Sequence, residues 1–189
     1  MTEGAATALA VPRRSLILVA GIPGAGKSTL LSRLRCTVPG LVVLDSDPLR
    51  ERLSRLFPAG TPYRVYRSLV HLWHRARILL AVLSVLGPVV VHLPATGALT
   101  RGAIALLALL ACRRRYLVWV DAEPELARRG QFSRRRVLGR SCFERHARRG
   151  VALAVRLRQG YRPRGWQRVA VLDRRQARYG LVLTGRSMA

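Results

Sequence analysis

The sequence predicts an α/β fold in which a five-stranded parallel sheet is flanked by helices. Short apolar runs of strand length recur along the 189 residues, and longer segments with apolar residues at helical spacing lie between them. A glycine-rich stretch follows directly after the first of these runs. Strands that alternate with helices are joined by right-handed crossovers, which give a parallel sheet covered on both faces.

Each predicted strand is a short apolar run that ends at glycine, proline or a charged or polar residue. The runs lie at residues 15–20, 41–45, 89–93, 116–120 and 168–173. Helices are expected from near Lys27, after Pro48, and at 62–86, 100–115, 123–130 and about 142–159. Proline is favoured in the first turn of a helix, and Gly87-Pro88 is a helix-stop signal.

One domain is predicted for most of the chain. Residues 15–175 are expected to form it, with a basic lid segment at about 128–142. Residues 1–14 are expected to be a disordered lead-in and residues 176–189 a C-terminal tail. The apolar stretches 78–93 and 104–112 fall short of the roughly 20 residues that span a membrane, so both are expected to be buried and no membrane partner is predicted.

The charge is strongly positive. The formal net charge is +25, and only one of the 34 basic residues, Lys27, is a lysine. Such a charge favours anionic partners, although a codon bias toward arginine on a solvated surface gives the same composition. The three cysteines form no CxxC pair, which predicts a reduced, cytoplasmic protein. Nothing in the sequence indicates a protein partner.

The stretch GIPGAGKST at residues 21–29 satisfies the pattern G-x-x-x-x-G-K-[ST]. It lies between a predicted strand and a predicted helix, the context in which this motif forms a phosphate-binding P-loop. The pattern predicts a P-loop NTPase that binds ATP and Mg²⁺, with Lys27 on the phosphates and the Ser28 hydroxyl on the metal ion. The residues expected to bind nucleotide are Gly21, Pro23, Gly24, Ala25, Gly26, Lys27, Ser28 and Thr29. A glycine turn that only joins strand to helix is the alternative.

Two aspartates and an arginine follow the second predicted strand. Asp45 and Asp47 lie two residues apart, so both side chains can point into the crevice at the carboxyl end of the sheet, and Arg50 lies one helical turn further on. Phosphoryl transfer needs a carboxylate near the attacking hydroxyl and cations around the phosphoryl group. The alternative for Asp47 is a purely structural N-cap of the following helix.

With these motifs the chain resembles P-loop kinase-like proteins of the AAA family, in particular polynucleotide 5′-kinases and zeta-toxin-type sugar-nucleotide kinases. The resemblance covers about residues 15–173. It implies that Asp47 is the catalytic base, that Arg50 holds a substrate phosphate and that Asp45 supports the Mg²⁺ water shell or orients Asp47. It also implies a mobile lid whose arginines contact phosphate: Arg134 and the catalytic Arg136, and less surely Arg129 and Arg140.

One position departs from the pattern. The third predicted strand ends at His92, where a Walker-B carboxylate is often found. A packed or hydrogen-bonded histidine and a metal ligand are both compatible with this position. The function predicted first is therefore a kinase that moves the γ-phosphate of ATP to a hydroxyl of an anionic acceptor: a nucleic-acid 5′ end, a nucleotide or a sugar nucleotide. An ATP-binding or ATPase regulatory module with little transfer is the alternative, and a nucleic-acid-binding protein with a vestigial P-loop is a third.

Overall fold

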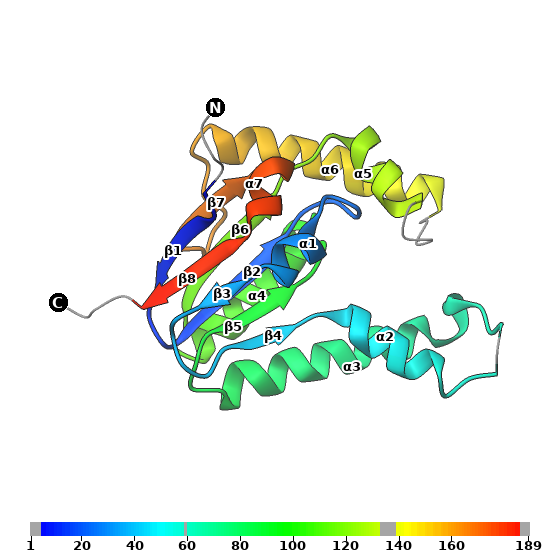
Figure 1. Cartoon of the computed structure of the whole chain (residues 1–189), viewed down its shortest axis with the longest axis horizontal. Coiled ribbons are helices and arrows are strands. Elements are labelled where there is room, and N and C mark those ends of the chain that lie inside the picture. The colour runs from blue at the N-terminus through cyan, green and yellow to red at the C-terminus, as the bar shows by residue number, and fades with distance from the viewer. Residues whose placement is uncertain (1–4, 59, 133–138, 186–189) are drawn as a thin grey trace.

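Five parallel strands form the main sheet, and they are the five strands that the sequence predicts. The computed structural model describes residues 5–58, 60–132 and 139–185. The spatial order is β4-β5-β2-β6-β7 (Figure 1). The strands span Val42–Leu44 (β4), Val89–His92 (β5), Ser15–Ala20 (β2), Arg114–Val120 (β6) and Arg168–Leu172 (β7). Every residue of β2 is buried, as expected for the central strand of a sheet with both faces covered.

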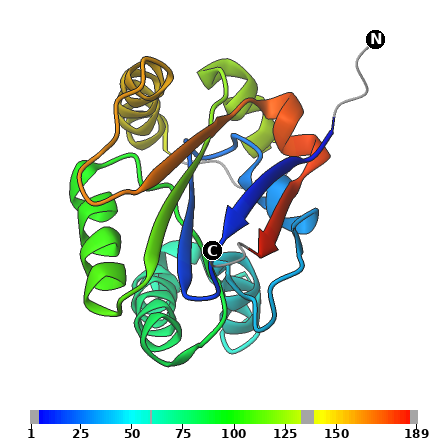
Figure 2. The same ribbon diagram turned by 90° about the vertical axis from the view of Figure 1, so that its left-hand side faces the viewer.

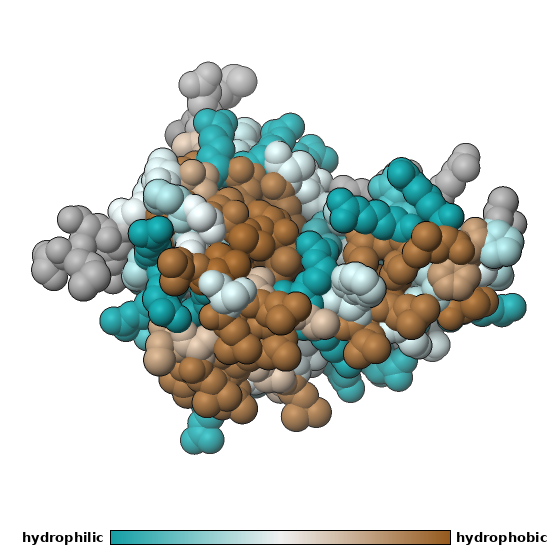
Figure 3. Space-filling model, turned by 90° about the horizontal axis from the view of Figure 1, so that it is seen from below, coloured by the Kyte–Doolittle hydropathy of each residue, from teal (hydrophilic) through white to brown (hydrophobic). Residues whose placement is uncertain are grey.

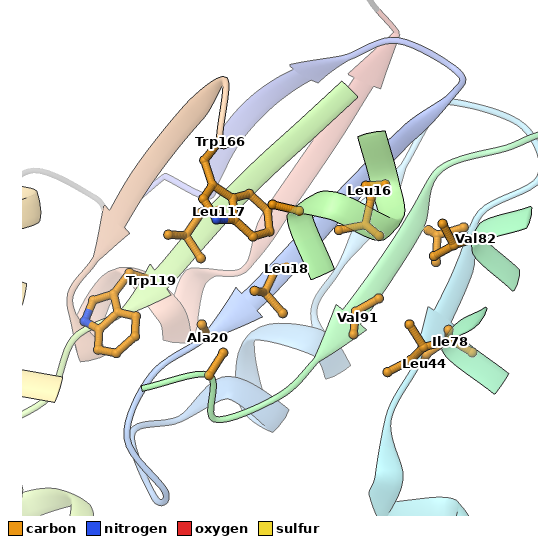
Figure 4. Packing of buried hydrophobic residues seen from close by; sticks show 14 of the residues in the cluster. Leu16, Leu18, Ala20, Leu44, Ile78, Val82, Val91, Leu117, Trp119 and Trp166 are labelled. Carbon is orange, nitrogen blue, oxygen red and sulfur yellow. The ribbon is translucent and has the colours of Figure 1, made fainter. Parts of the chain in front are cut away.

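Helices connect these strands and cover both faces of the sheet (Figures 1 and 2). They span Lys27–Ser32 (α1), Ser46–Ser54 (α2), Tyr63–Ser84 (α3), Ala98–Leu110 (α4), Pro124–Phe132 (α5), Arg140–Arg158 (α6) and Arg174–Tyr179 (α7). Side chains of α3 and α4 pack on one face against β2, β5 and β6 (Figure 4). Side chains of α1 and α7 pack on the other face, and α6 contributes to both clusters.

Both terminal segments differ from expectation. Thr7–Val11 in the expected disordered lead-in forms strand β1, and Leu181–Gly185 in the expected tail forms β8. These strands pair in parallel, and β8 also pairs with the short β3 (Arg35–Cys36) in a second sheet ordered β1-β8-β3. The side chains of Val11, Leu181 and Leu183 are buried in the α1 side of the core, so this pairing is stabilised by contacts that are remote in sequence.

The apolar stretches expected to be buried are only half buried. One side of α3 and of α4 packs on the sheet, but several leucines on the opposite side are exposed: Leu79, Leu80, Leu83, Leu106, Leu109 and Leu110. None of the described helices is long and apolar enough to cross a bilayer. These helices therefore carry more apolar side chains than the core buries.

A buried arginine joins the end of α3 to the sheet. Arg113 is 2% exposed, and its guanidinium donates hydrogen bonds to the carbonyl oxygens of Val82 at 2.7 Å and Gly87 at 2.9 Å. It also donates to the carbonyl oxygens of Ser15 and Val85. One side chain therefore satisfies carbonyl groups that the last turn of a helix leaves without a partner.

Candidate active site

The P-loop connects β2 to α1 at the carboxyl edge of the main sheet. Gly24 and Gly26 have φ angles of 88° and 107°, a left-handed conformation that residues other than glycine rarely adopt. A Cβ atom on Gly24 would lie 2.0 Å from the backbone oxygen of Ala127 in α5, so only glycine lets the loop pack this closely. The side-chain amide of Gln131 in α5 donates to the backbone oxygen of Pro23 at 3.1 Å and fixes the loop from the same side.

Lys27 lies under this loop. Its side chain is 5% exposed, and Nζ donates hydrogen bonds to the backbone oxygens of Gly21 at 2.9 Å and Ile22 at 2.8 Å. An ammonium group on a flexible stem can turn back over the loop in this way, whereas a planar guanidinium needs a wider, fork-shaped set of partners. These contacts hold a positive charge beside the backbone N–H groups that form the cradle.

Asp45 caps α2 and pairs with His92. Its Oδ1 accepts a hydrogen bond from the backbone N–H of Asp47 at 3.1 Å, which makes Asp45 the N-cap of the helix. The alternative that assigned this cap to Asp47 is therefore wrong, because the helix begins at Ser46, two residues before Pro48. Nδ1 of His92 lies 2.7 Å from the same Oδ1.

The Asp45 carboxyl is ionised at neutral pH. Burial raises the pKa of the Asp45 carboxyl, but the hydrogen bond and charge of His92 and the Asp47 N–H outweigh burial, so the pKa is below its ordinary value. An ionised carboxylate only accepts hydrogen bonds, so His92 must donate from Nδ1. The position that departs from the Walker-B pattern is therefore a hydrogen-bonded histidine, one of the two readings that the sequence left open.

A cavity of about 220 Å³ brings the predicted residues of the P-loop and of α2 together. It is lined by Lys27 and Ser28 on one side, by Asp47 and Arg50 on the other, and by His92 between them. The Arg50 guanidinium lies over the Tyr63 ring, 4.1 Å from its centre, which orients it. Asp45, an expected metal ligand, does not line this cavity, but it is hydrogen-bonded to His92, which does.

A larger cavity of about 640 Å³ adjoins the first and shares Pro94 with it. It lies between α3, α4 and α6, and its ionisable lining residues are His71, His74, Arg75, His146 and Arg149. It is lined by no carboxylate among the residues described, so the lining favours an anionic ligand.

Two contacts position the segment after β5 that lines the larger cavity. Nδ1 of His146 in α6 lies 2.7 Å from the Thr96 hydroxyl, after β5. Burial and the nearby positive charges of Arg145 and Lys27 lower the pKa of His146, so its imidazole is neutral at pH 7. Arg101 of α4 donates to the backbone oxygens of Ala95 and Thr96 at 2.8 and 2.9 Å. Sequence reasoning missed Thr96, Arg101, Gln131 and the role of His146, because no motif connects these remote residues.

A small cavity of about 120 Å³ lies on the other side of the P-loop, toward α7. Its lining includes Gly26, Thr29, Gly130, Arg174 and Arg178. Arg174 is held in place by a hydrogen bond from Nη1 to the backbone oxygen of Leu126 at 2.8 Å. The P-loop therefore has a cavity on each side, which is the arrangement needed for a ligand that crosses the loop.

The expected lid is described only at its ends. Arg134 and Arg136 lie outside the described residues. Arg129 and Arg140, the less certain lid arginines, pair with glutamates four residues away on their own helices, at 3.6 Å to Glu125 and 2.9 Å to Glu144. Such exposed ion pairs are weak, so either arginine can leave its glutamate and contact another group.

The site fits a nucleotide phosphate with Mg²⁺. The positive-φ glycines and Lys27 form an anion cradle, and Ser28 places a hydroxyl in the same cavity. No group of three His, Cys, Asp or Glu side chains able to hold a metal occurs within residues 5–58, 60–132 and 139–185. The Ser28 hydroxyl is the P-loop oxygen that could hold Mg²⁺ there, with phosphate oxygens and water as further ligands.

Comparisons with known proteins give the same fold. A family model described as an AAA domain matches residues 16–157. A chain from the PezAT chromosomal toxin–antitoxin system of Streptococcus pneumoniae is similar with a TM-score of 0.61 at 16% identity, over 93% of this chain and 72% of that one. A proposed kinase from Chloroflexus aurantiacus is similar with a TM-score of 0.59 at 16% identity, over 86% and 88% of the two chains. A search of curated proteins gave no match.

Proposed function

Because the chain belongs to the AAA-domain family of P-loop proteins, we propose that it is an ATP-dependent phosphotransferase. It moves the γ-phosphoryl group of ATP to a hydroxyl of an anionic acceptor. One observation carries this proposal: Lys27 and Ser28 share a cavity of about 220 Å³ with Asp47 and Arg50. A phosphate cradle that faces a carboxylate and a second cation across a small cavity has the parts that phosphoryl transfer needs.

The residues divide the reaction between them. Lys27 and the loop N–H groups hold the β- and γ-phosphates, and Mg²⁺ bound through Ser28 would neutralise the charge on the phosphates. Asp47 accepts the proton of the acceptor hydroxyl as its oxygen attacks the γ-phosphorus, the bond to the β-phosphate bridging oxygen breaks, and ADP leaves. Arg50 balances the negative charge on the acceptor side.

The Asp45–His92 pair acts on Asp47 through the backbone. Asp45 holds the Asp47 N–H and so fixes the start of α2, while His92 keeps Asp45 ionised and in position. In this proposal Asp45 acts as a positioning residue for Asp47. Arg134 and Arg136 are proposed to close over ATP and contact the transferring phosphoryl group.

The acceptor is proposed to occupy the 640 Å³ cavity between α3, α4 and α6. The cavity adjoins the P-loop cavity at Pro94, so an acceptor bound there can present its hydroxyl to Asp47. Arg75 and Arg149 offer positive charge to an anionic group of the acceptor, as in a nucleotide, a sugar nucleotide or a nucleic-acid 5′ end. The adenosine of ATP is then proposed to lie on the other side of the loop, in the cavity lined by Arg174 and Arg178.

The Asp47→Asn variant tests the proposed reaction. The variant is expected to lower kcat for transfer from γ-labelled ATP about 10²-fold, the low end of the general-base range, because the transition state of phosphoryl transfer is loose. Acceptors are screened as pools of oligonucleotides, nucleotides, sugar nucleotides and antibiotics. Glu51→Gln, a carboxylate change on the exposed side of α2, is the matched control and is expected to leave kcat unchanged. Full transfer activity in Asp47→Asn would remove Asp47 from the chemistry.

Arg149 tests the acceptor cavity. Arg149→Ala is expected to raise KM for the acceptor about tenfold with little change in KM for ATP, because a charge-assisted contact to a phosphate is worth about 1.5 kcal/mol. Arg148→Ala is the matched control, since Arg148 directly precedes Arg149 in α6 but lines a different surface hollow, toward α5. Equal effects of the two variants would assign the change to net charge rather than to this cavity.

An ATP-binding or ATPase regulatory module is the second candidate, and His92 in place of a Walker-B carboxylate favours it. This candidate predicts ADP and inorganic phosphate from wild-type protein without a labelled acceptor. An oligonucleotide acceptor would instead give a labelled 5′ end, in a reaction that weakens steeply with added salt.

A further inference from the structure

The exposed side of α3 and α4 is an unusually apolar surface, which the reaction does not use. We call it the leucine face and define it by four residues of α3 and two of α4: Leu69, Leu72, Leu80, Leu83, Leu106 and Leu110. Each is more than half exposed, and Leu72 and Leu110 reach 67% and 72%. Figure 3 views the molecule from the side of α3 and shows apolar side chains gathered there. A gathered set of exposed apolar side chains is a common mark of an interaction surface.

The stripe on α3 has regular helical spacing. Leu69, Leu72, Leu80 and Leu83 follow one another at intervals of three, eight and three residues, which places them on one side of the helix. The residues of α3 that pack on the sheet, such as Val70, Ile78 and Val82, lie on the other side. The same holds for α4, where Leu106 and Leu110 are one turn apart and Ala105 and Ala108 are buried. The helices α3 and α4 also contact each other.

Charge decides what can cover this surface. Neither α3 nor α4 contains an acidic residue. On a helical wheel Arg64 lies beyond one edge of the α3 stripe and Arg77 lies beyond the other. A second copy of this chain would bring another formal charge of +25 against the same arginines, so like charges oppose self-association.

We propose that the leucine face docks on an anionic lipid bilayer surface. An amphipathic helix with leucine and tryptophan on one side and arginine at its borders lies in the plane of the membrane, with its apolar side in the interface and its cations at the lipid phosphates. The sequence argued against a membrane partner only because no apolar stretch can span. Docking at the interface needs one apolar side, which α3 provides over roughly 33 Å of helix.

Trp73 gives a direct probe of docking. It lies at the edge of the leucine face and is 58% exposed, whereas Trp119 and Trp166 are 1% and 5% exposed in the core. Net charge alone would attract the protein to anionic vesicles, so co-sedimentation does not distinguish attraction from insertion. A shift of Trp73 emission to shorter wavelength, and its quenching by lipids brominated in their acyl chains, report insertion of this side chain.

The experiment compares the full chain with vesicles of phosphatidylcholine and with vesicles that also contain phosphatidylserine. The emission shift and the quenching are expected with the anionic vesicles and are expected to weaken as salt is added. Trp73→Phe is expected to lose both signals, which assigns them to this residue.

A double variant tests whether the leucines drive insertion. Leu72→Glu with Leu83→Glu is expected to weaken partition into anionic vesicles at least about tenfold, because two apolar side chains are replaced by carboxylates. The matched control is Val155→Glu with Val151→Glu, which makes the same kind of change at exposed positions of α6. Circular dichroism and nucleotide binding check that both variants are folded.

Several outcomes overturn the proposal. If anionic vesicles leave the emission of Trp73 unchanged in the wild-type protein, the proposal is wrong, and no variant is needed to show it. An equal loss in the α6 control leaves only net charge as the cause. A dimer in light scattering that disappears in the α3 variant assigns the face to a second copy instead. None of these measurements uses phosphoryl transfer, so the proposal stands or falls separately from the proposed function.

Discussion

Lys27→Arg is expected to lower kcat/KM for phosphoryl transfer about 10³-fold, although the chain uses arginine for every other cation of this kind. Nζ of Lys27 is buried under the loop, within 2.9 Å of the oxygens of Gly21 and Ile22. A guanidinium is wider and cannot occupy the same space without moving the loop against α5, where Gly24 leaves no room. Steady-state kinetics with γ-labelled ATP and the identified acceptor measure the loss.

The control for this variant is Arg148→Lys, which exchanges the same two residue types at an exposed position of α6 and is expected to change kcat/KM less than twofold. A nucleotide-binding titration separates the two ways in which Lys27→Arg can fail. Normal ADP affinity with lost turnover indicates a charge needed only in the transition state, whereas lost affinity indicates a distorted cradle. Full turnover in Lys27→Arg would contradict the proposed role of the lysine.

Arg113→Ala is expected to lower the free energy of unfolding by about 3–5 kcal/mol. The guanidinium is 2% exposed and donates to carbonyl oxygens at the end of α3, before β5 and at the start of β2. Its removal leaves several buried acceptors without a donor and opens a space that alanine does not fill. Denaturant titration followed by the fluorescence of the buried Trp119 and Trp166 measures the change.

Arg114→Ala is the matched control for Arg113→Ala, because Arg114 is the next residue but its side chain is exposed. It is expected to cost less than about 0.5 kcal/mol. Arg113→Lys keeps the charge but has fewer donors, and an intermediate value is expected. A loss in Arg113→Ala no larger than that in Arg114→Ala would show that the hydrogen bonds of Arg113 do not support α3.

Local pattern was enough where a feature depends on neighbours in sequence. The five strands of the main sheet were predicted because each is a short apolar run between breaker residues. The P-loop was predicted because its glycines, lysine and serine lie within nine residues. Asp47 and Arg50 were expected near the P-loop because parallel strands end at one edge of the sheet, and the cavity at that edge contains both residues.

Pattern was misleading where burial depends on a distant partner. Thr7–Val11 lacks a strong strand signal, which favours a disordered lead-in, but it pairs with Leu181–Gly185 at the other end of the chain. Alanine and leucine in α3 and α4 predicted buried helices, yet the sheet covers only one side of each. Apolar composition indicates which residues can be buried, and the arrangement of the layers decides which of them are.

Local sequence pattern was sufficient to predict the phosphate side of the site: a cradle with one lysine, a serine beside it and a carboxylate after the neighbouring strand. The surroundings of these residues depend on contacts that appear only in the folded protein. The fold pairs Asp45 with His92 across 47 residues, joins Thr96 to His146 across 50 and leaves the leucine face uncovered. The physical reason is that motif geometry is set by the dihedral angles of consecutive residues, whereas cavities, buried pairs and exposed faces are set by packing between elements remote in sequence.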